Sequence, residues 1–332
     1  MIRAYLYVHK DQPETELIKR VVAAFQDEFP HIMTIINIES DNYLASEYDE
    51  KAPVLDIGPY RLQSPFSEDE IAFAFAETQK KLNWADKKGD RIMLDRFTQP
   101  LKMTGSDKFS LWFSKHYMLL FNLVVFLYVG LPFMAPVFMK ANITGPANVI
   151  YKIYKPLCHQ LAFRSWFLFG EQTAYPRELA NVTGLMTYGE VSGNDEFDIA
   201  AAREFNGNEV IGYKVAFCQR DIAIYAAILL FGLLFSITGK RIRPVPWYVW
   251  LIIGIVPIGI DGVSQLLSQT GLSFLAWLPL RESSPLLRTI SGGLFGFFTA
   301  WYGYPFVEES VAETRSQMQN KLSIIKQIPK ED

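Results

Sequence analysis

At two places in the chain a cysteine lies close to another side chain that can bind a metal. Cys158 is followed directly by His159, and Cys218 is followed three residues later by Asp221. Thiol, imidazole and carboxylate groups are all ligands of Zn²⁺, so these four residues form a candidate metal site. On an oxidising side of a membrane the two cysteines would instead be expected to form a disulfide. Two free structural thiols are the third alternative.

Arginine, aspartate and glutamine side chains accompany these residues. Polar groups in membrane-spanning segments are costly and usually mark a function or a buried ion pair. Asp261 is expected to pair with Arg288 or Arg220 and so fix the helix register, or else to carry protons or bind a substrate. The arginines could also hold a phosphate or an anionic headgroup. The whole predicted cluster comprises Cys158, His159, Gln160, Arg164, Cys218, Arg220, Asp221, Asp261, Gln265 and Arg288.

Four long stretches of the chain avoid charge. The mean hydropathy of the 332 residues is +0.09 and the net charge is −3, but these values average a charged N-terminal part and an apolar remainder. Residues 116–139, 222–239 and 289–307 contain no Asp, Glu, Lys or Arg, and residues 244–280 contain only Asp261. A hydrocarbon core about 30 Å thick needs about 20 mostly apolar residues to be crossed. The sequence predicts a membrane protein with a soluble N-terminal domain, which excludes a purely soluble enzyme and, for want of basic charge, a nucleic-acid-binding protein.

We expect an all-α membrane domain over residues 116–306, preceded by a basic juxtamembrane linker (91–115) and followed by a cytoplasmic tail (307–332). The short connection 239–244 carries three cations and no anion, so by the positive-inside rule it is cytoplasmic. An even number of spans then places both termini in the cytoplasm, at a plasma (inner) membrane. Residues 149–169 are too polar to span and are expected to form a helix in the outer interface. Four spans are predicted at about 116–138, 217–238, 245–267 and 287–306.

This topology brings the predicted cluster to one depth near the outer leaflet. Its members lie on the interfacial helix, at the start of the second span, in the outer third of the third span and at the start of the fourth. Small residues let transmembrane helices approach closely, so glycines are expected to join the third and fourth spans. These glycines are Gly254, Gly259, Gly262, Gly292, Gly293 and Gly296.

Residues 1–90 alternate β-forming and amphipathic segments in the order β-α-β-x-β-β-α, an α/β domain. The expected strands cover residues 3–8, 32–38, 52–58 and 60–63, and the expected helices begin at Pro13 and at Glu68. This order resembles the glutaredoxin-like proteins of the thioredoxin superfamily, whose first strand leads into Cys-x-x-Cys. Residues 12–15 (Gln-Pro-Glu-Thr) occupy that place here, and Pro53 matches the family's cis proline. Thiol exchange needs a thiolate and this domain has no cysteine, so we expect a redox-inactive docking module or, alternatively, a site that binds a thiol ligand against Pro53.

The C-terminal region resembles a family of uncharacterised prokaryotic membrane proteins, a domain of unknown function. The matching motifs are Cys158-His159-Gln160, Arg164-Ser165, Cys218-Gln219-Arg220, Asp261-Gly262 and Arg288. The family has a second cysteine in a Cys-x-Arg-Cys motif, and Asp221 stands there in this chain. The resemblance implies no known activity.

Three classes of function are compatible with these patterns. The favoured one is a membrane binding or accessory protein, a subunit or docking anchor whose N-terminal domain meets a protein partner. The alternatives are a transporter of small molecules or lipids and a metal-dependent membrane enzyme acting at the cluster. The sequence contains no nucleophile–base pair, Gly-rich phosphate loop or HExxH motif, which argues against an enzyme.

Overall fold

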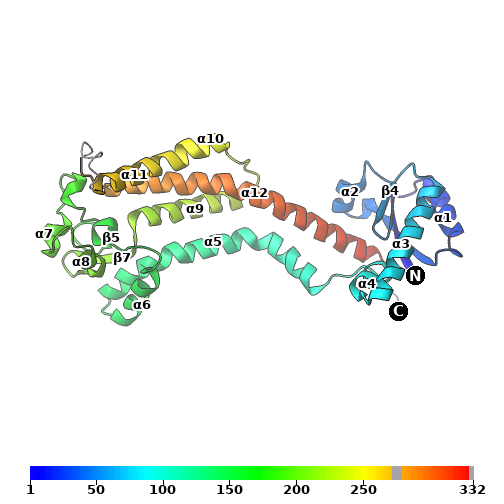
Figure 1. The fold of residues 1–332 in the computed structure, drawn as a ribbon, viewed down its shortest axis with the longest axis horizontal. Helices are drawn as coiled ribbons and strands as arrows, with labels where there is room; N and C mark the ends of the chain where they lie inside the picture. The colour runs from blue at the N-terminus through cyan, green and yellow to red at the C-terminus, as the bar shows by residue number, and fades with distance from the viewer. Residues whose placement is uncertain (271–278, 329–332) are drawn as a thin grey trace. The chain divides into compact units, whose positions relative to one another are not determined.

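The computed structural model describes residues 1–270 and 279–328 (Figure 1). The chain divides into two compact units, Met1–Lys115 together with Val311–Asp332, and His116–Ser310. Two long helices, α5 (Gly105–Lys140) and α12 (Pro285–Gln327), contribute residues to both units. The C-terminal segment therefore folds with the N-terminal unit, which the sequence did not predict.

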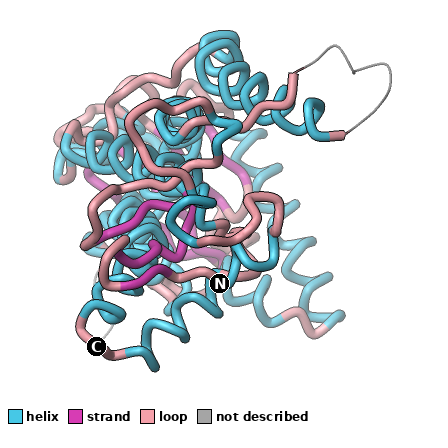
Figure 2. Tube along the Cα trace, turned by 90° about the vertical axis from the view of Figure 1, so that its left-hand side faces the viewer, coloured by secondary structure: helices cyan, strands magenta, loops and turns pink. Residues whose placement is uncertain are grey.

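The N-terminal unit contains a four-stranded sheet with the order β2-β1-β3-β4 (strands in magenta in Figure 2). β1 pairs with β2 in parallel and with β3 in antiparallel orientation, and β3 and β4 are antiparallel. The four strands lie where the sequence predicted them. The peptide bond that precedes Pro53 is cis. The strands are β1 (Ile2–Val8), β2 (His31–Asn37), β3 (Val54–Ile57) and β4 (Tyr60–Gln63).

Three helices cover one face of this sheet, α1 (Glu14–Ala24), α3 (Glu68–Lys88) and α4 (Arg91–Thr98). α3 begins at the predicted residue with a capping box, in which Ser67 and Glu70 bond to each other's backbone N–H groups. The expected linker 91–115 was wrong in its first part. Residues 91–98 form α4. The apolar side chains of this helix recur on one face, so that Phe97 lies in the core.

The opposite face of the sheet is covered by α2 (Asn42–Tyr48), the 3₁₀ turn η1 (Ile38–Ser40) and the end of α12. Ile324 of α12 is buried in this second core. The backbone of Asn37 exchanges hydrogen bonds of 2.9 and 3.1 Å with the side-chain amide of Gln327. The segment expected as a cytoplasmic tail (307–332) is helical up to Gln327, and its apolar side chains complete the core of the N-terminal unit.

Among the described residues, three helices are long and apolar enough to cross a membrane: Gly105–Lys140, Gln219–Ile237 and Trp247–Gln269. They overlap the first three predicted spans, and most of their apolar surface is exposed in the protein alone, as expected of helices that face lipid. The fourth predicted span lies in the first part of α12. It is not among the three, because its Gly, Ser, Thr, Trp and Tyr residues make it less apolar. The second of these helices is α9 (Gln219–Ile237). The third consists of α10 (Trp247–Val249), the π-helical segment η4 (Trp250–Ile255) and α11 (Val256–Gln269).

The segment between α5 and α9 is folded around an aromatic core that includes Phe163, Phe167 and Tyr188. The expected interfacial helix 149–169 was wrong, because α6 ends at Tyr154, just before Pro156. The later residues pair over a long range, so that β5 joins the antiparallel sheet β5-β7-β6. The elements are α6 (Thr144–Tyr154), η2 (Ala162–Arg164), β5 (Ser165–Leu168), η3 (Glu178–Ala180), α7 (Tyr188–Ser192), α8 (Ile199–Glu204), β6 (Gly207–Asn208) and β7 (Gly212–Cys218).

Helix α12 packs closely on α9 through two glycines one turn apart. A Cβ atom at Gly296 would lie 2.1 Å from the carbonyl oxygen of Ile224, and one at Gly292 would lie 2.7 Å from that of Arg220. At Gly293, by contrast, a Cβ would meet no described atom within 4 Å. Gly292 and Gly296 of the fourth predicted span therefore face the second span, whereas the sequence predicted contact with the third.

We expect Gly296→Ala to destabilise the membrane unit by about 1–3 kcal/mol, because the added methyl forces two helix backbones apart. Gly293→Ala is the matched control and should leave stability unchanged or raise it slightly, since alanine favours the helix. Thermal unfolding of both variants in detergent, followed by circular dichroism, measures the difference. Equal melting temperatures would contradict the observed packing.

Candidate functional site

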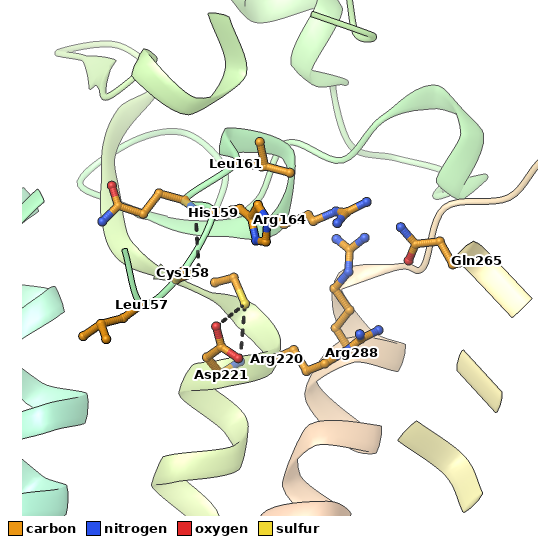
Figure 3. A pocket seen from close by; sticks show the side chains of 11 residues that line it. Leu157, Cys158, His159, Leu161, Arg164, Arg220, Asp221, Gln265 and Arg288 are labelled. Carbon is orange, nitrogen blue, oxygen red and sulfur yellow. Dashed lines mark hydrogen bonds between the residues drawn. The ribbon is translucent and has the colours of Figure 1, made fainter. Parts of the chain in front are cut away.

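A polar cavity of about 280 Å³ lies in the membrane unit where α9 and α12 begin (Figure 3). We call it the polar pocket. Every residue of the predicted cluster except Asp261 belongs to its described lining. The lining residues are Leu157, Cys158, His159, Gln160, Leu161, Arg164, Cys218, Arg220, Asp221, Gln265 and Arg288.

One side of the polar pocket carries the thiol cluster, which we define as Cys158, Cys218 and Asp221. Cys218 ends β7 and caps α9: its Sγ accepts a hydrogen bond from the backbone N–H of Asp221 at 3.4 Å and donates to Asp221 Oδ2 at 3.0 Å. Cys158 lies in the loop after α6, where its Sγ accepts from the backbone N–H of Gln160 at 3.5 Å. The two Sγ atoms and a carboxylate oxygen of Asp221 lie within 4.8 Å of one another. The structure thus brings three candidate ligands together, with both cysteines unbonded to each other.

The two thiols differ in acidity. A side-chain hydrogen bond with Cys218 lowers the pKa of the Cys158 thiol, although burial opposes this. The hydrogen bond with Cys158, together with burial, raises the pKa of the Cys218 thiol well above its usual value. The thiolate is the form of cysteine that binds metals, so a metal at this cluster would need both thiols deprotonated.

His159 is separate from the thiol cluster. It lines the polar pocket, but its ring nitrogens do not belong to the group of ligand atoms around Cys158. Figure 3 shows its imidazole beside Arg164 instead. The predicted Cys/His/Cys/Asp set is therefore only partly assembled, because adjacent side chains of an irregular loop diverge.

Gln160 and a buried lysine hold this loop in place. The side-chain amide of Gln160 donates hydrogen bonds of 3.0 Å to the carbonyl oxygens of Tyr151 and Ala216. Lys214 of β7 is fully buried and donates to the carbonyl oxygens of Gln160 at 2.9 Å and Arg203 at 2.8 Å. Burial lowers the pKa of Lys214 to about 7. These contacts fix the backbone that carries Cys158, and sequence analysis did not find Lys214.

The other side of the polar pocket carries the arginine cluster, which we define as Arg164, Arg220 and Arg288. In Figure 3 the guanidinium groups of Arg164 and Arg288 approach each other opposite the thiol cluster. Both bind Glu282, whose side chain is 1% exposed: Arg164 donates at 2.8 Å, and Arg288 forms a second ion pair. Arg177 lies 3.5 Å from the other carboxylate oxygen. Glu282 is thus the buried counter-ion of three arginines.

Electrostatics keep Glu282 ionised. Burial alone would raise its pKa, but the hydrogen bond from Arg164 and the charges of the arginines hold the pKa below its usual value. Sequence analysis missed Glu282. A signal was present, because Glu282 is the only acidic residue between Asp261 and Glu308.

Asp261 of α11 lies behind the polar pocket and is 2% exposed. Of the two partners that the sequence allowed, it binds Arg220. It also accepts hydrogen bonds from Arg281 at 3.0 Å and from the Ser283 hydroxyl at 2.8 Å. The predicted alternative, Arg288, binds Glu282. Gln265, one turn further along α11 than Asp261, donates a hydrogen bond to Glu282 at 3.0 Å. Helix α11 thus contributes side chains to the surroundings of both buried carboxylates.

Comparisons with known proteins agree with a membrane domain. Residues 209–302 match a family described as "Predicted membrane protein (DUF2085)". An uncharacterized protein of Methanocaldococcus jannaschii is 25% identical over 205 residues, which is 59% of this chain and 96% of that protein. No solved structure matches the chain significantly. The resemblance to a membrane family of unknown function is confirmed for residues 209–302, and the glutaredoxin-like resemblance stays a prediction.

Proposed function

We propose that this chain is an integral membrane binding protein that holds a transition metal ion of the Zn²⁺ type in the polar pocket. Cys158, Cys218 and Asp221 would supply the ligands. The observation that carries the proposal is the convergence of their three donor atoms within 4.8 Å from segments far apart in the sequence. Two thiolates of one tetrahedral Zn²⁺, each about 2.3 Å from the ion, lie about 3.8 Å apart, which fits this spacing.

Three protein ligands would leave the fourth position of a tetrahedral ion open to the polar pocket. Zinc sites with three protein ligands typically bind water or a substrate at that position. The resembling family has cysteine where Asp221 stands. Both residue types are metal ligands, so this exchange keeps a donor at the start of α9. His159 lies outside the group of converging ligand atoms and is not part of the proposed ligand set.

We further propose four spans, with the first part of α12 as the fourth and the polar pocket on the exoplasmic side. The 19 residues of α9 make a helix about 28 Å long, close to the thickness of a hydrocarbon core. One end of α9 adjoins the polar pocket. The other adjoins the basic connection 239–244, where Lys240 lies 3.6 Å from Glu308. Both termini would then be cytoplasmic.

For the N-terminal unit we propose a redox-inactive, thioredoxin-like docking module that meets a protein partner. Its support is the strand order β2-β1-β3-β4 together with a sequence that contains no cysteine before Cys158. The whole chain would then be a membrane anchor that couples this module to a metal-binding pocket.

Zinc titration of the purified protein tests the metal site. Competition with a chromogenic chelator, in detergent, should give one Zn²⁺ per chain. Asp221→Asn should weaken binding by at least about 10-fold, since even residues behind the ligands typically contribute 10- to 100-fold. The double variant Cys158→Ser/Cys218→Ser should lose binding.

Asp195→Asn is the matched control, because Asp195 is an exposed aspartate of the same unit. It should bind zinc as the original protein does. The proposal fails if the double serine variant retains one tight Zn²⁺, or if Asp221→Asn and Asp195→Asn behave alike.

A further inference from the structure

The arginine cluster is placed where helix geometry disfavours cations. Arg220 is the second residue of α9, and Arg288 is the fourth residue of α12. The first turn of a helix carries a partial positive charge from its unsatisfied N–H groups and stabilises anions there. The N-terminus of α12 and Arg288 therefore add their positive potential on one side of the polar pocket, whereas the first turn of α9 carries both Arg220 and Asp221.

Cations outnumber anions among the described side chains that line the polar pocket. Arg164, Arg220 and Arg288 stand against Asp221 alone. The buried carboxylates that bind these arginines, Glu282 and Asp261, are not part of this lining. An anion that enters the pocket therefore meets an excess of positively charged side chains.

Hydrogen-bonding capacity is left over on the same groups. A guanidinium has five N–H donors. Among the described residues, Nε of Arg220, which lines the polar pocket, has no hydrogen-bond partner. The guanidinium fork matches the oxygen geometry of phosphate.

The size and lining of the cavity limit the ligand. Its volume of about 280 Å³ is at the small end of ligand pockets, which span about 300–1,000 Å³. Its lining is polar apart from Leu157, Leu161 and the two thiols of Cys158 and Cys218. Such a cavity suits one small, charged group rather than an apolar molecule.

From these observations we infer that the arginine cluster binds a phosphate group in the polar pocket, opposite the thiol cluster. The group belongs either to free inorganic phosphate or to the headgroup of an anionic lipid. Glu282 and Asp261 hold the three guanidinium groups from behind. The inference therefore does not require a metal at the thiol cluster.

Calorimetric titration of the full chain with inorganic phosphate, after removal of metals with a chelator, tests this inference. We expect binding that weakens with added salt. Arg164→Gln is the first variant, because its side chain is 29% exposed and its loss is least disruptive to folding. It should weaken phosphate binding by about 10-fold or more, the usual effect of losing hydrogen bonds to a charged group.

A second variant, Arg220→Lys, keeps the charge but loses the planar fork, and should also bind more weakly. Arg241→Gln is the control, because Arg241 is exposed in the connection after α9. Melting temperatures recorded for every variant separate lost binding from lost folding. Repeating the titration with Zn²⁺ present separates this inference from the metal proposal.

A parallel arm distinguishes the two sources of phosphate. The protein is placed in nanodiscs of phosphatidylcholine, with and without phosphatidic acid. Binding of inorganic phosphate that phosphatidic acid leaves unchanged identifies the free ion. Retention of phosphatidic acid, lost in Arg164→Gln, identifies the lipid headgroup. The inference is overturned if neither binds, or if the Arg164, Arg220 and Arg241 variants bind equally.

Discussion

Replacing Glu282 with glutamine should destabilise the membrane unit by about 3–5 kcal/mol, the usual result of removing one partner of a buried ion pair. The side chain is 1% exposed and compensates Arg164, Arg177 and Arg288 together. Glutamine has nearly the same size as glutamate and can still accept hydrogen bonds, so the loss of stability reports the missing negative charge. Thermal unfolding in detergent measures it.

Acid should reveal the same interaction. Because the pKa of Glu282 is lowered in the folded protein, its contribution is complete above the ordinary glutamate pKa and is lost as pH falls through the lowered value. The stability difference between the original protein and Glu282→Gln should therefore shrink in acid. Glu209→Gln, at an exposed glutamate, is the control. A Glu282→Gln variant as stable as this control at neutral pH would refute the role of Glu282.

Asp261→Asn should have an effect of similar size, about 3–5 kcal/mol. Asp261 is 2% exposed and joins α11 to Arg220 of α9 and to Arg281, so asparagine would leave two guanidinium groups without their counter-ion. A double-mutant cycle with Arg281→Gln isolates one of these pairs. In the Asp261→Asn background, Arg281→Gln should cost little further stability. Additive losses would mean that the two side chains are not coupled.

The convergence of the polar residues was predictable from their cost in apolar segments. Asp261 interrupts one stretch that otherwise avoids charge and Arg288 directly precedes another, and such residues pair or line a cavity. The same reasoning allowed Arg220 as the partner of Asp261, which the structure has. The same reasoning did not identify Glu282. This residue lies in a connection between two predicted spans, where a charged side chain is expected to be solvated, although in the structure it is buried.

Irregular and long-range features lay beyond the sequence patterns. The aromatic residues at 149–169 fit an interfacial helix by composition, but Pro156 ends α6 and residues 165–168 pair with β7. Strand pairing across such a distance has no local signal. Likewise, the burial of Phe97 and Ile324 was not predicted, because these residues lie in the segments expected as a linker and a tail. Both pack on faces of the sheet whose position cannot be inferred from the local sequence.

Cobalt substitution tests the central claim, a metal site made by the thiol cluster, most directly. Co²⁺ replaces Zn²⁺ in tetrahedral sites and gives visible absorption bands whose intensity and position report thiolate ligands. Adding Co²⁺ to the metal-free protein should produce thiolate-to-metal bands at one equivalent, which weaken in Cys158→Ser and in Cys218→Ser and vanish in the double variant. A spectrum that stays that of hydrated Co²⁺, or that the Cys218→Ser variant leaves unchanged, would contradict the metal site.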